Sequence, residues 1–343
     1  MLCLYELVSP PFDNDRTLFM NRLGLLLISF SLLTGANTYA ETQMLEPKSC
    51  FRGPFESYER WAGVLKKNKP GFNEKAFQRF FPAEKFNQRK TDLDCTDFTY
   101  QSDDFNVEGF YLAPKSPEKP LPVVIFNRGG NARFGYVVFG TKMDLPAELA
   151  SEGYIVLGSQ YRGASRRVEN NGKDEFGGAD VNDVLALIDI AKSLPHADTS
   201  RIALVGWSRG VMQSYLAAKQ LTDVKAIVSV AGNADLKQAI VWRPEMEKVY
   251  AARMPDYASR KEQLLNERSV INWVDQLPPA PILMLHGTAD TRVNVEQSRL
   301  LASALNAANH TNKLITFEGG NHGLTQHRTA AYAEIKDWLN QYL

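Results

Sequence analysis

A serine between two glycines is the strongest candidate for chemistry in this sequence. Within residues 201–218, a short apolar run ends at Gly206, Ser208 follows two positions later, and helical spacing begins after Gly210. A nucleophilic serine needs a tight strand-to-helix turn that lifts its hydroxyl above a sheet, and glycines on either side relieve the crowding. The dipole of the following helix favours negative charge at the same point. The pattern predicts a nucleophile at Ser208; the alternative is a plain tight turn.

A serine hydroxyl is a weak nucleophile, so it needs a base, and the base needs an acid to orient it. Downstream of the serine, Asp290 lies in the loop after one predicted buried strand, and His322 lies in the loop after the next. We therefore predict a triad with Asp290 as acid and His322 as base. Of their rivals, His286 is interpreted as a structural histidine that holds the loop of Asp290, and Glu318 as structural.

Acyl transfer at the serine would also need two donors for an oxyanion. The backbone N–H of Arg209, directly after the nucleophile, is predicted to be one donor. The second is predicted in the glycine-rich loop "FNRGGNARFG", at the backbone N–H of Gly129 or Gly130. In the alternative interpretation these glycines only form a turn.

Several arginines near these loops are candidates for binding a carboxylate of the substrate, although arginines in loops are also commonly solvated. They are Arg128, Arg133, Arg162, Arg166 and Arg167. Together with Tyr161 and Trp207, Arg128 and Arg162 are the candidate substrate-binding residues.

The elements that must position these residues follow an alternating pattern from residue 122 onward. Apolar strands alternate with amphipathic helices, which predicts an α/β fold with a doubly wound, mostly parallel sheet and helices on both faces. Ligands of such sheets gather at the carboxyl ends of the strands, where the candidate triad lies. A β-hairpin over 97–114 is expected to add antiparallel strands, and a helical insertion near 235–266 is the predicted lid. Asp144 is expected to cap a helix that Gly153 closes.

The N-terminal 40 residues read as a leader. Met20 and Arg22 precede an apolar run over 23–33, and small residues lead to Ala40. This pattern is typical of a secretory signal with cleavage before Glu41, so we expect translation to start at Met20 and the protein to be periplasmic or secreted. The alternative is an uncleaved membrane anchor. The remaining chain is predicted to divide into a helical or irregular segment over 41–96 and a catalytic domain over 97–343.

Cysteine usage and charge agree with an exported enzyme. Cys50 and Cys95 are the two cysteines of the expected mature chain, and they could form a disulfide or stay unpaired. Neither lies in a Cys-x-x-Cys or Cys/His cluster, so no metal site is predicted. Lys+Arg and Asp+Glu both total 39, which gives no reason to expect a nucleic-acid partner. No stable membrane partner is expected.

From about Val107 to its end, the chain resembles the α/β-hydrolase superfamily, and within it the catalytic domain of the prolyl oligopeptidase family of serine peptidases. The resemblance rests on three blocks: "SQYRGASRRVENNGKDEFGGADVNDVLALIDIAKSLPHADTSRIALVGWSRG", "RSVINWVDQLPPAPILMLHGTADTRV" and "GGNHGL". By matching motifs it implies the roles of nucleophile, acid and base for Ser208, Asp290 and His322. Arg209 and Val211 replace residues common around the elbow of the family, and the roughly 60 residues before the hairpin are too few for the β-propeller that many members carry.

The residues and the resemblance together predict an exported serine hydrolase that cleaves short peptides or small esters through an acyl-enzyme. Such chemistry requires no metal or organic cofactor. One alternative is a carboxylesterase without peptidase activity. An alternative of another class is a non-catalytic binding protein with an inherited triad.

Overall fold

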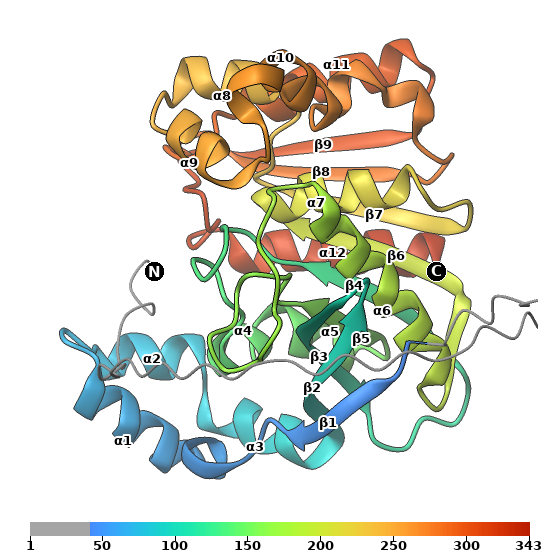
Figure 1. The fold of residues 1–343 in the computed structure, drawn as a ribbon. Helices are drawn as coiled ribbons and strands as arrows, with labels where there is room; N and C mark the ends of the chain where they lie inside the picture. The colour runs from blue at the N-terminus through green and yellow to red at the C-terminus, as the bar shows by residue number, and fades with distance from the viewer. Residues whose placement is uncertain (1–41) are drawn as a thin grey trace, which may run out of the picture.

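One mixed sheet organises the part of the chain that the computed structural model describes, residues 42–343 (Figure 1). Its strand order is β1-β2-β3-β5-β4-β6-β7-β8-β9. The strands are β1 (Met44–Ser49), β2 (Leu93–Ser102), β3 (Phe105–Pro114), β4 (Leu121–Asn127), β5 (Ile155–Ser159), β6 (Ala197–Trp207), β7 (Val224–Val230), β8 (Ile282–Gly287) and β9 (Asn312–Phe317). From β5 through β4 to β9 all neighbours pair in parallel, whereas β1, β2 and β3 pair antiparallel, as does β3 with β5.

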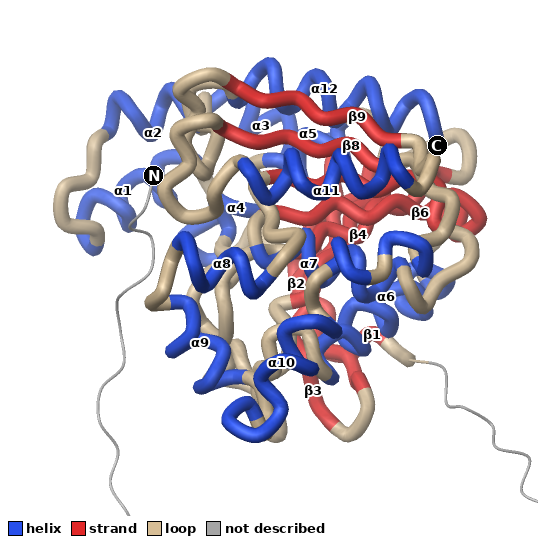
Figure 2. The backbone as a smooth tube through the Cα atoms, turned by 90° about the horizontal axis from the view of Figure 1, so that it is seen from above, coloured by secondary structure: helices blue, strands red, loops and turns tan. Residues whose placement is uncertain are grey.

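Helices cover both faces of this sheet (Figure 2). They are α1 (Tyr58–Asn68), α2 (Glu74–Phe80), α3 (Ala83–Asp92), α4 (Phe139–Lys142), α5 (Leu145–Ser151), α6 (Asn182–Ser193), α7 (Arg209–Ala218), α8 (Leu236–Trp242), α9 (Met246–Arg253), α10 (Tyr257–Glu267), α11 (Glu296–Ala307) and α12 (Arg328–Tyr342). Successive residues of β4 alternate between two cores. Val124 belongs to the core that includes residues of α5 and α12, and Val123 and Ile125 belong to the core that includes residues of α6, α7 and α11. Because both faces are buried, the strands read as continuous apolar runs. The predicted doubly wound sheet is confirmed.

The hairpin and the insertion also form as expected. β2 and β3 pair in register from Leu93↔Pro114 to Ser102↔Phe105. Between β7 and β8, helices α8, α9 and α10 pack on one another as a group (Figure 1). This insertion follows the carboxyl end of β7, so it begins at the sheet edge where a ligand is expected.

Residues 42–96 form a largely helical segment, as expected, and this segment also belongs to the same sheet and core as the rest of the described chain. Residues 44–49 form β1, which pairs with β2, and β2 itself begins at Leu93. Helices α1 to α3 bury Trp61, Phe77 and Phe86, and Trp61 packs edge-on against Phe139 of α4. β1 was missed because "MLEPKS" is a mostly exposed edge strand with little apolar alternation, and its pairing with β2 creates the strand.

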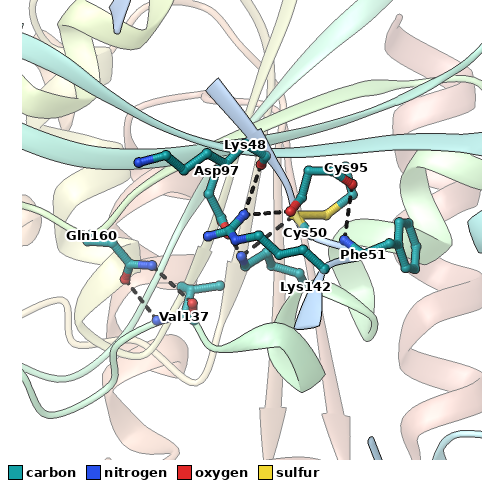
Figure 3. The surroundings of a disulfide bond; sticks show 10 residues. Lys48, Cys50, Phe51, Cys95, Asp97, Val137, Lys142 and Gln160 are labelled. Atoms are coloured by element: carbon teal, nitrogen blue, oxygen red, sulfur yellow. Dashed lines mark hydrogen bonds and ion pairs between the residues drawn. A yellow bond between two sulfur atoms is a disulfide. The ribbon is translucent and has the colours of Figure 1, made fainter. Parts of the chain in front are cut away.

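A disulfide joins Cys50, directly after β1, to Cys95 in β2 (Figure 3). Both cysteines are buried, and their Cα atoms are 5.3 Å apart. The buried ammonium of Lys142 lies 3.7 Å from Cys50 Sγ and pairs with Asp97. The cross-link closes a loop with a sequence separation of 45, and a bridge of this kind stabilises a fold by about 2–4 kcal/mol. The sequence left open whether Cys50 and Cys95 are bonded or unpaired, and in the structure they are bonded.

The predicted leader, the start at Met20 and the cleavage before Glu41 lie outside the described residues. Across residues 42–343, no helix has both the length and the apolar character needed to span a bilayer.

Candidate active site

Ser208 occupies the turn between β6 and α7 in a strained backbone conformation. Its φ is 57° and its ψ is −123°, which is costly for a residue with a side chain. A Cβ on Gly206 would lie 2.5 Å from the carbonyl oxygen of Gly210, and a Cβ on Gly210 would overlap the carbonyl of Asn127. The flanking glycines are therefore required by close backbone contacts. The backbone N–H of Ser208 donates to Val230 at the end of β7 (2.8 Å), which holds the turn on the sheet.

The acid and the base come from the loops after the two neighbouring strands β8 and β9. Asp290 Oδ2 accepts a hydrogen bond from His322 Nδ1 at 2.7 Å. The loops are joined by the Ala289 N–H, which donates to the Gly320 carbonyl (3.0 Å). Because Nδ1 carries the proton that Asp290 accepts, Nε2 is left as the basic nitrogen of His322.

The histidine loop is also tied to the serine turn. Trp207 Nε1 donates to the backbone oxygen of His322 at 3.3 Å, so the residue before Ser208 contacts the base's own backbone. Within the described residues, no hydrogen bond joins Ser208 Oγ to His322. Catalytic hydrogen bonds are commonly long in an empty site and shorten when substrate binds. The structure thus brings the predicted acid and base together, and Trp207 ties the histidine loop to the turn of the predicted nucleophile.

His286 supports the acid loop, as predicted. Its ring is fully buried, Nδ1 lies 2.7 Å from Ser298 Oγ, and Nε2 lies 3.0 Å from the carbonyl of Val293 and 3.2 Å from Asp290 Oδ2. Since Val293 and Asp290 both offer acceptors, Nε2 carries the proton and Ser298 donates to Nδ1. The buried ring of His286 therefore joins Asp290, Val293 and Ser298 and holds the loop of the predicted acid.

The carboxyl of Asp290 is held in its charged form. Burial raises its pKa, but hydrogen bonds from His286 and His322, with a backbone N–H of Val293, outweigh burial and bring the pKa below the ordinary value of 3.8. Oδ1 also accepts the N–H of Arg292 at 2.8 Å. The acid therefore stays ionised throughout the neutral range and can fix the tautomer of His322.

The predicted oxyanion donors are backbone N–H groups without partners in the described part of the chain. Arg209 is the first residue of α7, and its N–H has no hydrogen-bond partner among residues 42–343; the same holds for the N–H groups of Gly129 and Gly130. A Cβ on Gly129 would lie 3.0 Å from the Cβ of Ser208 and 3.6 Å from its Oγ. Only glycine fits this close approach without displacing a neighbour, and the segment 129–135, named here the oxyanion loop, lies directly against the serine.

Three of the four candidate substrate-binding residues are structural instead. The guanidinium of Arg128 is buried and donates to the carbonyls of Gly129, Ala132, Phe134 and Gln160. Arg162 is buried and pairs with Asp183 and Asp103, and buried Tyr161 donates to the Arg128 carbonyl. These predictions were wrong because burial of a loop arginine depends on partners that are distant in sequence. Trp207 is the fourth, half-buried beside the histidine loop.

The sequence predicts a role for the backbone N–H of Arg209 but not for its side chain. It is buried and forms ion pairs with Asp174 (2.5 Å) and Asp180. Burial lowers its pKa, but the two carboxylates outweigh burial, and the pKa lies above its ordinary value. Asp174 also accepts the N–H of Ala132 at 2.6 Å, and Arg209 donates to the carbonyl of Gly130 at 3.2 Å. The network therefore ties α7 to the oxyanion loop. The sequence did contain one indication of this role, because Arg209 stands directly after the serine, where an aromatic residue is common in the family that the chain resembles.

Comparison with known proteins agrees with this geometry. The sequence model of the prolyl oligopeptidase family matches residues 143–343. A relative described as the uncharacterized peptidase YtmA of Bacillus subtilis (strain 168) is 25% identical over 207 residues, which are 60% of this chain and 77% of the relative. The acylamino-acid-releasing enzyme of Rattus norvegicus is 26% identical over 259 residues, 70% of this chain but 33% of the relative.

The fold is also found among solved structures. Pyrococcus horikoshii acylaminoacyl peptidase superposes with a TM-score of 0.65 at 21% identity, covering 80% of this chain and 44% of that one. This similarity establishes the α/β-hydrolase fold. The chain spans 32–44% of the length of several of its relatives, whereas it spans 77% of YtmA.

Proposed function

Because the chain belongs to the prolyl oligopeptidase family, we propose that it is an exported serine hydrolase that cleaves short peptides or small esters with Ser208, His322 and Asp290. The observation that carries the proposal is the 2.7 Å pair between His322 Nδ1 and Asp290, presented beside a serine in a strained strand-to-helix turn. Peptide cleavage is supported by the peptidases among its relatives.

In the proposed reaction, His322 Nε2 removes the proton of Ser208 as Oγ attacks the substrate carbonyl carbon. Asp290 holds the ring in the required tautomer and stabilises the imidazolium that forms. The N–H groups of Arg209 and of Gly129 or Gly130 hold the oxyanion. His322 then protonates the leaving amine or alcohol, an acyl-enzyme remains, and a water activated by the same histidine releases the acid. The helices α8 to α10 are proposed as the lid of this site.

The test of this proposal uses a fluorophosphonate and matched substrates. The reagent is expected to form a single adduct, which peptide mass spectrometry maps to Ser208. Hydrolysis of an acyl ester and of the anilide with the same acyl group then identifies the reaction class. Turnover of both supports a peptidase; turnover of esters alone would make carboxylesterase the correct name. An adduct at another residue would contradict the assigned nucleophile, and no adduct would favour a non-catalytic binding protein.

Export is proposed from the N-terminal sequence and supported by the disulfide. Disulfides persist in oxidising compartments and are rare where thiols are kept reduced, and Cys50 and Cys95 are bonded here. The expected result is that protein recovered from the periplasm or medium of the producing cell has Glu41 as its first residue, as read by N-terminal sequencing. A chain that retains residues 23–33 would contradict cleavage.

A further inference from the structure

Three arginines from three separate segments meet at the oxyanion loop. Arg133 lies in the loop itself and is exposed. Arg253, at the end of α9 in the proposed lid, donates from Nε to Asn131 Oδ1 at 3.1 Å. Arg292, two residues after Asp290, places its guanidinium over the ring of Phe134, 5.9 Å from the ring centre. We name Arg133, Arg253 and Arg292 the arginine rim.

The oxyanion loop connects this rim to the nucleophile over a short distance. Gly129 lies next to Ser208, since a Cβ on Gly129 would be only 3.0 Å from the Cβ of Ser208. The chain then turns back at 131–134, and a Cβ on Gly130 or Gly135 would overlap the opposite backbone. The backbone of Phe134 and Gly135 therefore lies on Gly129 and Gly130. The arginines that contact this hairpin lie at the entrance to the site, since the side chain of Phe134 is 50% exposed.

The charge of the rim is not neutralised by the described protein. Across residues 42–343, no carboxylate lies within ion-pair distance of Arg133, Arg253 or Arg292. The acids of neighbouring elements have other partners: Asp174 and Asp180 pair with Arg209, Glu245 with Arg243, and Glu247 with Lys261. The protein therefore has equal numbers of cationic and anionic residues overall but a cationic entrance.

We infer that the arginine rim binds a carboxylate of the substrate, so that the site prefers short peptides or esters that carry a negative charge. This inference rests on the proposed function. A planar guanidinium matches a carboxylate with two parallel hydrogen bonds, and exposed Phe134 provides an apolar surface for the carbon chain beside it. The rim thus takes the role that the sequence suggested for Arg128 and Arg162, whose guanidinium groups are used within the fold.

Two matched pairs of substrates test the inference. The 4-nitrophenyl monoester of glutaric acid and 4-nitrophenyl pentanoate differ by a carboxylate in the acyl part; 4-acetoxybenzoate and its methyl ester differ by one in the leaving group. After subtraction of the rate of each ester without protein, which for the glutarate monoester includes attack by its own carboxylate, kcat/KM is expected to favour the acid in at least one pair. The expected factor is roughly five- to tenfold, as several partly exposed ion pairs would give. The preference should weaken at 0.5 M salt, because screening acts on exposed charges.

Variants assign the effect to the rim. Arg133→Gln, Arg253→Gln and Arg292→Gln, combined, should remove the preference for the acid, measured as the ratio of kcat/KM on the acid to kcat/KM on the neutral ester of the same pair. Arg299→Gln is the matched control, since Arg299 is exposed on α11 and pairs with Glu296. Equal rates on acid and neutral esters in the wild-type protein, or a preference that survives the triple variant, would overturn the inference and leave the proposed function intact.

A separate measurement covers the case in which no ester is turned over. Glutarate and 4-hydroxybenzoate should then slow the labelling of Ser208 by the fluorophosphonate more than glutaramide and 4-hydroxybenzamide do, and the triple variant should lose this difference. Equal protection by acids and amides would overturn the inference. Failure of the reagent to label Ser208 at all would instead count against the proposed function.

Discussion

Replacing Ser208 with alanine is expected to lower kcat/KM by about a millionfold and to leave the fold unchanged. Loss of the nucleophile removes the acyl-enzyme route, and in a well-studied serine protease loss of this group alone costs about as much as loss of the whole triad. The remaining activity would come from the oxyanion donors and from binding. The measurement is the rate of the preferred ester or anilide, with fluorophosphonate labelling as a second readout.

The stability of this variant separates chemistry from folding. Residue 208 has a φ of 57° and its backbone N–H donates to Val230. Both features belong to the backbone, so alanine at this position should have the same backbone strain as serine. We expect the free energy of unfolding to change by less than about 1 kcal/mol. Ser214→Ala on α7 is unsuitable as a control because Ser214 is buried and hydrogen-bonded. Ser116→Ala is the matched control, since Ser116 is exposed and its hydroxyl has no hydrogen-bond partner among residues 42–343. Activity retained by Ser208→Ala would refute the assigned nucleophile.

Asp290→Asn is expected to reduce kcat by about 10⁴-fold. The amide can donate toward His322 Nδ1, which favours the wrong tautomer and places the proton on Nε2, where the base needs a lone pair. The amide also cannot balance the charge of the imidazolium. The measurement is kcat for the variant beside Asp275→Asn, the same change at an exposed carboxylate, which should leave kcat within twofold.

The pH dependence of stability gives this prediction a second test. The folded pKa of Asp290 is depressed, so its ionised form contributes stability above its unfolded pKa of about 3.9, and that contribution is lost as pH falls through the folded pKa. The difference in unfolding free energy between wild type and Asp290→Asn should therefore be constant above about pH 5 and shrink in more acidic solution. A difference that grows on acidification, or full activity in the variant, would show that Asp290 is not the charged acid of the site.

The sequence by itself located the candidate catalytic residues and their order along the chain. The glycines around Ser208 can be recognised in the sequence because close backbone contacts permit no other residue there. The structure shows these contacts between Gly206 and the Gly210 carbonyl and between Gly210 and the Asn127 carbonyl. Asp290 and His322 follow apolar strands, and parallel strands deliver their carboxyl ends to one edge whatever the details of packing. Short motifs and periodic apolar patterns of this kind can be recognised in a sequence without knowledge of its tertiary contacts.

Only the tertiary structure decided which charged groups are available to a substrate. Asp144 fits a helix cap by sequence, yet its carboxylate pairs with Arg328 and Tyr332 of the C-terminal helix, more than 180 residues away. Arg128 directly precedes the oxyanion loop, and its guanidinium donates to backbone carbonyls, whereas Arg253 contacts that loop from α9 of the proposed lid. The physical reason is that burial and pairing of a charge depend on segments that folding brings together, and the spacing of residues along the chain carries no record of those partners.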